Sequence, residues 1–380
     1  MKLKNFIKKS KKITAVYLTF KYSALLGAKL NFKSIYKFSD DFNRYSTSST
    51  EINQESIKRI ACAYIAAKSD QKIASEHHRP NAMWDPIFKK QHQKISDALL
   101  TEDYESIVKI YSRFFRESCS FGLHGCYGDM TPFFKEKIAL HDKLYYMIDF
   151  NHREKLYEDL IDEGSSTTLN SPIIGAPYGL TRNNKFISDG SSYKHYYSTR
   201  ISSLLNFENE ETVLEIGGGH GGMAYYLNRD SKVKYIDLDL PENMALTAFY
   251  LMHTLPTKKI MLYGEDSIDN LSKYDIVILP SFAIDQIKST SVDLVFNSYS
   301  FGEMSSNTVE MYLSETDRIL KPEGWLYHIN LNKKCPNPAD NYPIPKSLRK
   351  IYKIPALWNA GKTPEVQEFE YLYKKTPKCI

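Results

Sequence analysis

The chain has 380 residues, of which 42% are hydrophobic and 25% are charged. This composition gives room for a large core and two domains, and it excludes a chain that is disordered over most of its length. The net charge of +5 is uneven: residues 1–37 hold ten lysines and no acidic residue, which leaves −5 on the remainder. We therefore expect a basic arm over residues 1–45. It is either a solvated extension or a contact with an anionic membrane surface, and nucleic acid is not the partner that we expect.

No sequence segment predicts a membrane span, since the best early apolar run, residues 13–20, is far shorter than the roughly 20 residues that a bilayer requires. The five cysteines are odd in number and form no CxxC pair. This pattern predicts reduced thiols and a cytoplasmic protein, or one held peripherally at the inner membrane face by its arm. Cys119, His124 and Cys126 lie close together, but no second ligand pair accompanies them, so no metal site is expected.

Apolar residues at helical spacing predict helices over residues 56–67, 103–115 and 133–150. The stretch 163–192 is rich in glycine, serine and proline, which is typical of a loop that joins two regions. Residues 46–190 are accordingly expected to form a helical cap that shapes the substrate pocket.

Strand and helix patterns alternate after the joint. Strands are predicted at 212–216, 232–238, 275–279, 292–296, 324–329 and 369–373. Helices are predicted at 193–205, 222–228, 242–255 and 308–320. This alternation indicates an α/β domain over residues 191–380, with a parallel sheet covered by helices on both faces.

The first of these strands runs into a glycine-rich turn. Ligands of a parallel sheet bind outside the carboxyl ends of the strands, where glycines let the backbone approach closely. The spacing of Gly217, Gly219 and Gly222 matches a dinucleotide site, whereas Glu215, Gly217, Gly219 and Gly221 match the E/D-x-G-x-G-x-G turn seen in methyltransferases. The acid favours S-adenosylmethionine, because that cofactor carries a positive amino-acid end and a sulfonium, whereas a carboxylate repels pyrophosphate.

An acid at the end of the second strand is expected to accept hydrogen bonds from the ribose hydroxyls, about 20 residues beyond the first glycine. Asp237 and Asp239 both lie at this distance, and as alternate residues of one strand they point the same way. Asp239 is preferred, because Leu240 and Pro241 follow where the strand gives way to a helix.

These motifs together resemble the class I S-adenosylmethionine-dependent methyltransferases over about residues 193–373. The matching stretches are 213–221, 239–241, 291–297 and 318–324. The resemblance implies a Rossmann-like fold with a mostly parallel seven-stranded sheet. Residues 297–304, the helical region and the loop 174–179 are similar to bacterial sugar O-methyltransferases, which implies a sugar hydroxyl of a surface glycan or glycosylated metabolite as the acceptor.

Four further residues are assigned to the cofactor site. The family usually has an acid near the adenine after the third strand, where Ser281 and Phe282 stand in this chain. Ser281 would hydrogen-bond the adenine edge, and Phe282 would pack on its face. His220 within the glycine turn and Asn297 at the end of the fourth strand complete the expected set.

A hydroxyl acceptor benefits from a general base. Plant-type O-methyltransferases have a histidine shortly after the fourth strand, where this chain has Gly302, so the neighbouring Glu303 is the first candidate base. His195, just upstream of the glycine turn, is the second candidate.

Acceptor contacts are expected from three tyrosines and an arginine, because aromatic faces suit sugar rings and a guanidinium suits an acidic sugar. These residues are Tyr178, Tyr193, Tyr196 and Arg200. A phenolic or amino acceptor is the alternative, as is a non-catalytic assembly protein that keeps the cofactor-binding fold. The sequence at 297–300 lacks the Asn/Asp-Pro-Pro motif of enzymes that methylate nucleic acid bases, and no acidic cluster after that strand indicates a metal.

Overall fold

The computed structural model describes residues 52–123, 157, 169–182, 185–206, 210–332, 335, 337–356 and 367–377. The basic arm and the helix predicted at 133–150 lie outside the described residues, as do His124 and Cys126. The arm's proposed contact with a membrane surface therefore stays a prediction. Among the described residues, no helix combines the length and apolar character needed to cross a bilayer.

One sheet of eight strands forms the centre of the molecule, in the order β5-β6-β4-β3-β7-β8-β10-β9. The bounds are β3 Thr212–Ile216, β4 Lys234–Asp239, β5 Ile260–Leu262, β6 Ile276–Pro280, β7 Val292–Ser298, β8 Leu320–Leu331, β9 Leu348–Pro355 and β10 Glu368–Lys375. The first six strands in this spatial order, β5, β6, β4, β3, β7 and β8, pair in parallel. β10 is antiparallel to both β8 and β9. The predicted mostly parallel Rossmann-like sheet is confirmed.

The expected number of seven strands is wrong, because the sheet has eight. Six were visible as apolar runs in the sequence. β5 is only three residues long, too short to give a period, and β9 is a charged edge strand whose side chains are mostly exposed. The sequence did not reveal β5 because its three buried apolar residues are too few to show a pattern, and it did not reveal β9 because an exposed strand lacks the apolar pattern of a buried one.

Helices cover both faces of the sheet, and alternate strand residues enter two separate cores. In β3, Val213 joins the core under α9 to α11, whereas Leu214 joins the core under α13. The helices are α9 Ser191–Leu204, α10 Gly222–Asp230, α11 Pro241–Thr254, α12 Ser300–Glu303 and α13 Ser306–Ile319, with the 3₁₀ turn η6 Ser281–Gln286. The predicted layers are present.

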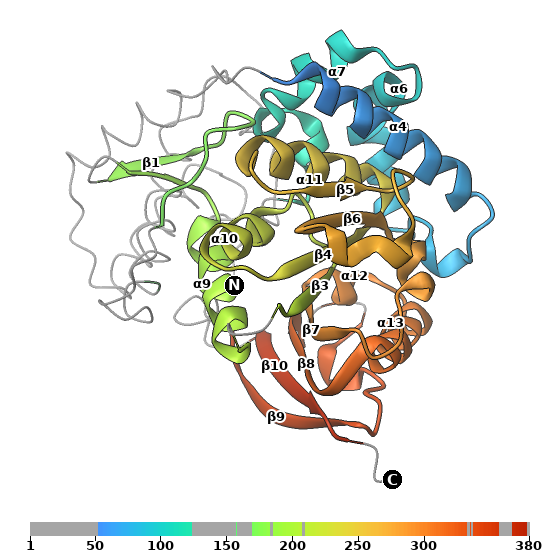
Figure 1. Ribbon diagram of the computed structural model, residues 1–380, viewed down its shortest axis with the longest axis vertical. Coiled ribbons are helices and arrows are strands. Elements are labelled where there is room, and N and C mark those ends of the chain that lie inside the picture. The colour runs from blue at the N-terminus through green and yellow to red at the C-terminus, as the bar shows by residue number, and fades with distance from the viewer. Residues whose placement is uncertain are drawn as a thin grey trace, which may run out of the picture.

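The helical N-terminal region packs directly on this domain, with α4 against α11 (Figure 1). Its described elements are α4 Gln54–Gln71, η1 Glu76–His78, α5 Trp84–Ile87, η2 Phe88–His92, α6 Gln93–Leu100, α7 Tyr104–Tyr111, η3 Phe114–Arg116 and η4 Ser118–Ser120. Lys68 Nζ lies 2.9 Å from a carboxylate oxygen of Glu242, and Arg59 bonds both oxygens of Glu265 at 2.6 and 2.8 Å. The region therefore shares one hydrophobic core with the sheet.

The expected joint at 163–192 contains regular structure. β1 Gly179–Arg182 and β2 Lys185–Ser188 form an antiparallel hairpin there. The glycines and serines of this stretch led to a loop interpretation, but short hairpin strands need little apolar patterning. Gly190 adopts φ 77 as the N-cap of α9, which begins at Ser191, two residues before the predicted start at residue 193.

Candidate functional site

A cavity of about 420 Å³ opens at the carboxyl ends of β3, β4 and β7. The glycine turn and the end of β4 form one wall, and α12 with the start of α13 forms another. The segment η1–α5 and one side of α9 complete the lining. Ligands of parallel sheets bind at this edge, and the volume is within the range of small-molecule sites.

The glycine turn needs glycine for two reasons. Gly217, Gly219 and Gly221 adopt φ values of 80, 66 and 79, which side-chain-bearing residues rarely adopt. A Cβ on Gly217 would lie 2.5 Å from Ser300 Oγ, so no larger residue fits between the turn and α12. A Cβ on Gly219 would have Leu123 Cδ2 as its nearest neighbour, at 3.7 Å, which leaves the space over the turn open.

Asp239 ties the end of β4 to this turn. Its carboxylate accepts hydrogen bonds from the backbone amides of Gly219 at 2.9 Å and Leu240 at 2.7 Å, and from Asn243 Nδ2 at 3.1 Å. Burial raises the pKa of Asp239 to about 6, although these three donors oppose the shift. The carboxylate therefore lies at the cavity wall in a fixed orientation.

Two further carboxyl groups gather beneath the turn. Glu215 lines the cavity and accepts a short hydrogen bond from the Tyr235 hydroxyl, and burial raises its pKa to about 7. Asp237 lies directly under Gly218, outside the cavity lining. Burial and the charges of Asp239 and Glu215 hold the pKa of Asp237 well above its usual range.

These raised pKa values predict that the ligand-free protein is more stable in mild acid. The folded state keeps protons on Glu215 and Asp239 up to about pH 7 and pH 6, whereas unfolded carboxyls release them near pH 4. The folded state thus binds more protons between these values, so the free energy of unfolding falls as pH rises from about 4 to 7. Urea unfolding at a series of pH values measures this fall.

Glu215→Gln should flatten this pH dependence, because the amide still accepts the Tyr235 hydrogen bond but does not titrate. Glu210→Gln is the matched control, since Glu210 is an exposed residue just before the same strand. An equal pH slope in the wild type and Glu215→Gln would contradict the assigned ionisation of Glu215.

Glu303 ends α12 at the opposite wall of the cavity. Its Oε2 accepts a hydrogen bond from Trp84 Nε1 at 2.8 Å, and its backbone oxygen accepts one from Asn81 Nδ2 at 2.6 Å. His77 Nδ1 lies 3.3 Å from Thr308 Oγ1 at the start of α13. The η1–α5 segment is thereby fastened over α12 and α13, and it closes one side of the cavity.

The turn that leads into α12 depends on buried amides. Asn297 Nδ2 donates to Ile216 O at 2.9 Å, which links the ends of β7 and β3. Asn330 Nδ2 donates to Asn297 Oδ1 at 2.9 Å, and Asn330 Oδ1 accepts from the Gly302 amide at 3.1 Å. Asn297 thus supports the site from behind the wall, rather than facing the cavity as expected for a cofactor contact.

Eight of the predicted site residues line the cavity: Glu215, Gly217, Gly219, His220, Asp239, Ser281, Tyr193 and Glu303. Among the cofactor candidates, Gly221, Asp237, Phe282 and Asn297 are not part of the lining. Gly221 caps α10, and the Phe282 ring packs edge-on against Tyr263 at 5.6 Å between centroids. Phe282 is therefore packed into the interior and is not an adenine-facing ring in this structure.

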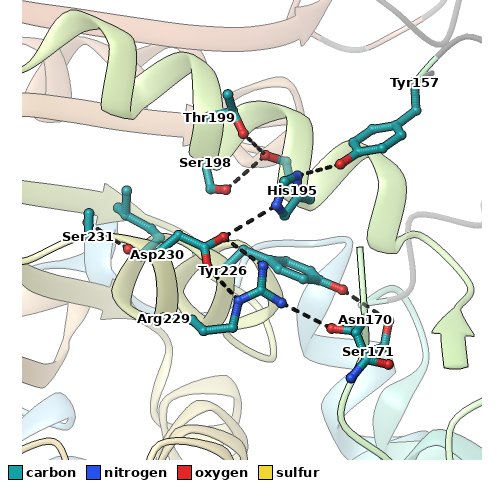
Figure 2. Close-up of polar contacts among 11 residues, drawn as sticks. Tyr157, Asn170, Ser171, His195, Ser198, Thr199, Tyr226, Arg229, Asp230 and Ser231 are labelled. Carbon is teal, nitrogen blue, oxygen red and sulfur yellow. Dashed lines mark hydrogen bonds and ion pairs between the residues drawn. The ribbon is translucent and has the colours of Figure 1, made fainter. Parts of the chain in front are cut away.

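The structure does not support His195 as a candidate base, because its side chain is fully buried and is not part of the cavity lining. Its Nδ1 lies 2.7 Å from the Tyr157 hydroxyl, and its Nε2 lies 3.3 Å from Asp230 Oδ2 (Figure 2). Arg229 pairs with the same Asp230 at 2.6 Å. On α9, residues 193, 194 and 197 face the cavity, and the helical period turns His195 toward α10.

The other three acceptor candidates also lie away from the cavity. Tyr178 packs under the Arg116 guanidinium at 4.2 Å, and Arg200 Nη2 donates to the Tyr352 hydroxyl at 3.1 Å. Tyr196 is buried in the core. These three residues pack within the fold instead of facing the cavity. Residue type alone does not distinguish a packed aromatic or basic side chain from one that contacts a ligand.

Several lining residues were missed in the sequence. Asn81 and Trp84 are more than 200 residues away from Glu303 in the chain, so no local pattern connects them. Lys194 lies beside predicted residues, but the direction of its side chain depends on the packing of α9. Asn243 follows the Leu240–Pro241 helix start, and its position in the first helical turn is a signal that was available.

The residues present fit S-adenosylmethionine. The open space over Gly219, the carboxylates of Glu215 and Asp239 at the wall and the cavity volume suit a nucleoside with a positively charged amino-acid end. Among the described residues, no cluster of three or more histidine, cysteine, aspartate or glutamate side chains is arranged to hold a metal ion.

Some solved methyltransferase structures are similar to this chain at low sequence identity. A TehB-like enzyme from Corynebacterium glutamicum is 14% identical over 48% of this chain and 88% of its own, with a TM-score of 0.36. An Aquifex aeolicus enzyme is 19% identical over 50% and 94%, with a TM-score of 0.31. Phosphoethanolamine N-methyltransferase 1 from Haemonchus contortus is 13% identical over 61% and 50%, with a TM-score of 0.35. All three scores are below 0.5, so the fold assignment depends on the strand order.

The sequence also matches a family model. Residues 214–328 match the model described as a methyltransferase domain, whereas a search of curated protein sequences finds no significant match. The matched range begins in β3 and ends in β8, so it contains the glycine turn, Asp239 and Glu303. The chain thus carries a methyltransferase domain over residues 214–328, which makes it an S-adenosylmethionine-dependent methyltransferase.

Proposed function

We propose that this enzyme methylates a sugar hydroxyl, in a surface glycan or a glycosylated metabolite. The observation that carries the proposal is the Glu303 carboxylate at the cavity wall, held by Trp84 Nε1 at 2.8 Å. A carboxylate in a fixed position beside the cofactor site suits an acceptor that must lose a proton, which a hydroxyl does.

The proposed role of Glu303 is that of a general base. The sulfonium of the bound cofactor supplies an activated methyl group. As the acceptor is methylated, Glu303 would accept the proton of its hydroxyl. The remaining work of the chain is to align the hydroxyl with the methyl carbon, and the η1–α5 segment closes the cavity on that side.

The mixed lining of the cavity supports a sugar ring as the acceptor. Aromatic side chains from four different elements line it together with polar ones, and aromatic faces give contact area to flat or ring-shaped ligands at low entropic cost. The aromatic residues are Trp84, Tyr193, Tyr197, Phe296, Tyr299 and Tyr312, and the polar ones include Glu76, Arg79, Asn307 and Thr308.

A methyl-transfer assay over acceptor classes tests the proposal. The enzyme is incubated with methyl-labelled S-adenosylmethionine and with nucleotide sugars, capsule oligosaccharides, catechols or primary amines. We expect label in the sugar fraction, and mass spectrometry should locate it on a hydroxyl oxygen. Transfer to catechols or amines with none to any carbohydrate would overturn the sugar assignment while leaving the methyltransferase assignment intact.

A further inference from the structure

Lys194 is a buried lysine whose side chain passes over Gly222 and lines the cavity. It belongs to α9, is 8% exposed and lines the cavity. Its stem crosses Gly222 so closely that a Cβ there would lie 2.5 Å from Lys194 Cδ and 2.9 Å from Cε. The lysine stem therefore fits in this position because residue 222 has no side chain. Its Nζ ends 3.1 Å from His220 Nε2.

The contacts of His220 determine which group carries the charge. His220 Nδ1 lies 3.2 Å from the backbone oxygen of Leu123, and a carbonyl oxygen only accepts hydrogen bonds, so Nδ1 carries the proton. Nε2 then accepts a hydrogen bond from the Lys194 ammonium. The imidazole is held edge-on by the rings of Phe115 and Tyr250 at 5.1 and 5.3 Å. His220 is thus neutral and fixed, and the positive charge belongs to Lys194.

The surroundings of Lys194 complement a zwitterion. Glu215 lines the same cavity, and the positive charge of Lys194 opposes the rise that burial causes in the pKa of Glu215. The α10 helix also begins here, and its cap residue Gly221 offers no side-chain oxygen to the first amides. Free amides at a helix start favour an anion. A carboxyl group and an ammonium group therefore line the cavity beside the glycine turn.

We propose that Lys194 binds the carboxylate of the amino-acid end of S-adenosylmethionine, and that His220 is the positioning residue that directs its ammonium. The cofactor's amino-acid end carries one ammonium and one carboxylate, which match the carboxyl of Glu215 and the ammonium of Lys194. This inference depends on the cofactor assignment and is independent of the acceptor.

Calorimetry with ligands that differ only at the amino-acid end tests the proposal. S-adenosylhomocysteine carries the carboxylate, whereas 5′-methylthioadenosine lacks the whole amino-acid end. Lys194→Met should weaken S-adenosylhomocysteine binding about 10- to 100-fold, the range for one lost charged hydrogen bond, and should leave 5′-methylthioadenosine affinity unchanged. Lys232→Met, an exposed lysine after α10, is the control and should leave both affinities unchanged.

A second comparison uses the wild type and so does not depend on the folding of a variant. Decarboxylated S-adenosylmethionine should bind the wild type more weakly than S-adenosylmethionine by a similar factor, and Lys194→Met should remove that difference. Equal affinities in the wild type would overturn the proposal. So would an equal loss for both adenosine ligands in Lys194→Met, or a rise in the acceptor KM with unchanged S-adenosylhomocysteine affinity, which would assign Lys194 to the acceptor.

Discussion

Asp239→Ala is expected to weaken S-adenosylmethionine binding by at least about 100-fold. The substitution removes the acceptor of the hydrogen bonds from Gly219, Leu240 and Asn243, so the glycine turn loses its link to β4. Hydrogen bonds to charged groups are worth about 1.5–3 kcal/mol each, and two of them suffice for this factor. The same carboxylate is our candidate for the ribose hydroxyls, which adds to the loss.

Calorimetry of S-adenosylmethionine and NAD with the wild type and Asp239→Ala measures the effect. Asp266→Ala is the matched control, because Asp266 also accepts a backbone amide and an asparagine side chain, but on the exposed turn before η5 Ile268–Lys273. Unchanged S-adenosylmethionine affinity in Asp239→Ala would remove Asp239 from the cofactor site. A wild-type preference for NAD would return the glycine turn to the dinucleotide interpretation.

Glu303→Gln is expected to lower kcat by about 10²- to 10⁴-fold, the range for loss of a general base. The glutamine oxygen still accepts the hydrogen bond from Trp84 Nε1, so the local structure should persist. S-adenosylhomocysteine affinity should stay within about twofold, because Glu303 is assigned to the acceptor proton and not to the cofactor. Steady-state kinetics with the accepted sugar, together with calorimetry, separates the two effects.

The pH dependence of kcat gives an independent check on Glu303. The acidic limb of the wild-type profile should be absent in Glu303→Gln, since the amide does not titrate. Glu310→Gln, an exposed glutamate on the neighbouring α13, should reproduce the wild-type profile. An active Glu303→Gln enzyme with an unchanged profile would show that another group accepts the proton.

The sequence by itself determined the sheet, the cofactor turn and the second-strand acid. These features depend on local patterns: apolar runs of strand length, glycines at fixed spacing after Glu215, and Asp239 at the next strand end. Local patterns suffice here because positive φ angles admit glycine most readily and because buried parallel strands need continuous apolar residues. The sequence did not reveal the edge strands: the apolar run of β5 is only three residues long, and β9 is mostly exposed and carries little apolar pattern.

Only the tertiary structure decided which polar residues face the cavity. Lys194 and His195 are neighbours on α9, yet one lines the cavity and the other is buried between Tyr157 and Asp230. The sequence period of a helix separates its faces but does not say which face meets which partner. Likewise, Trp84 reaches Glu303 across 219 positions, and that contact depends on how the helical region packs on the sheet. Side-chain direction and long-range contact are set by packing of the whole core, and no local pattern encodes them.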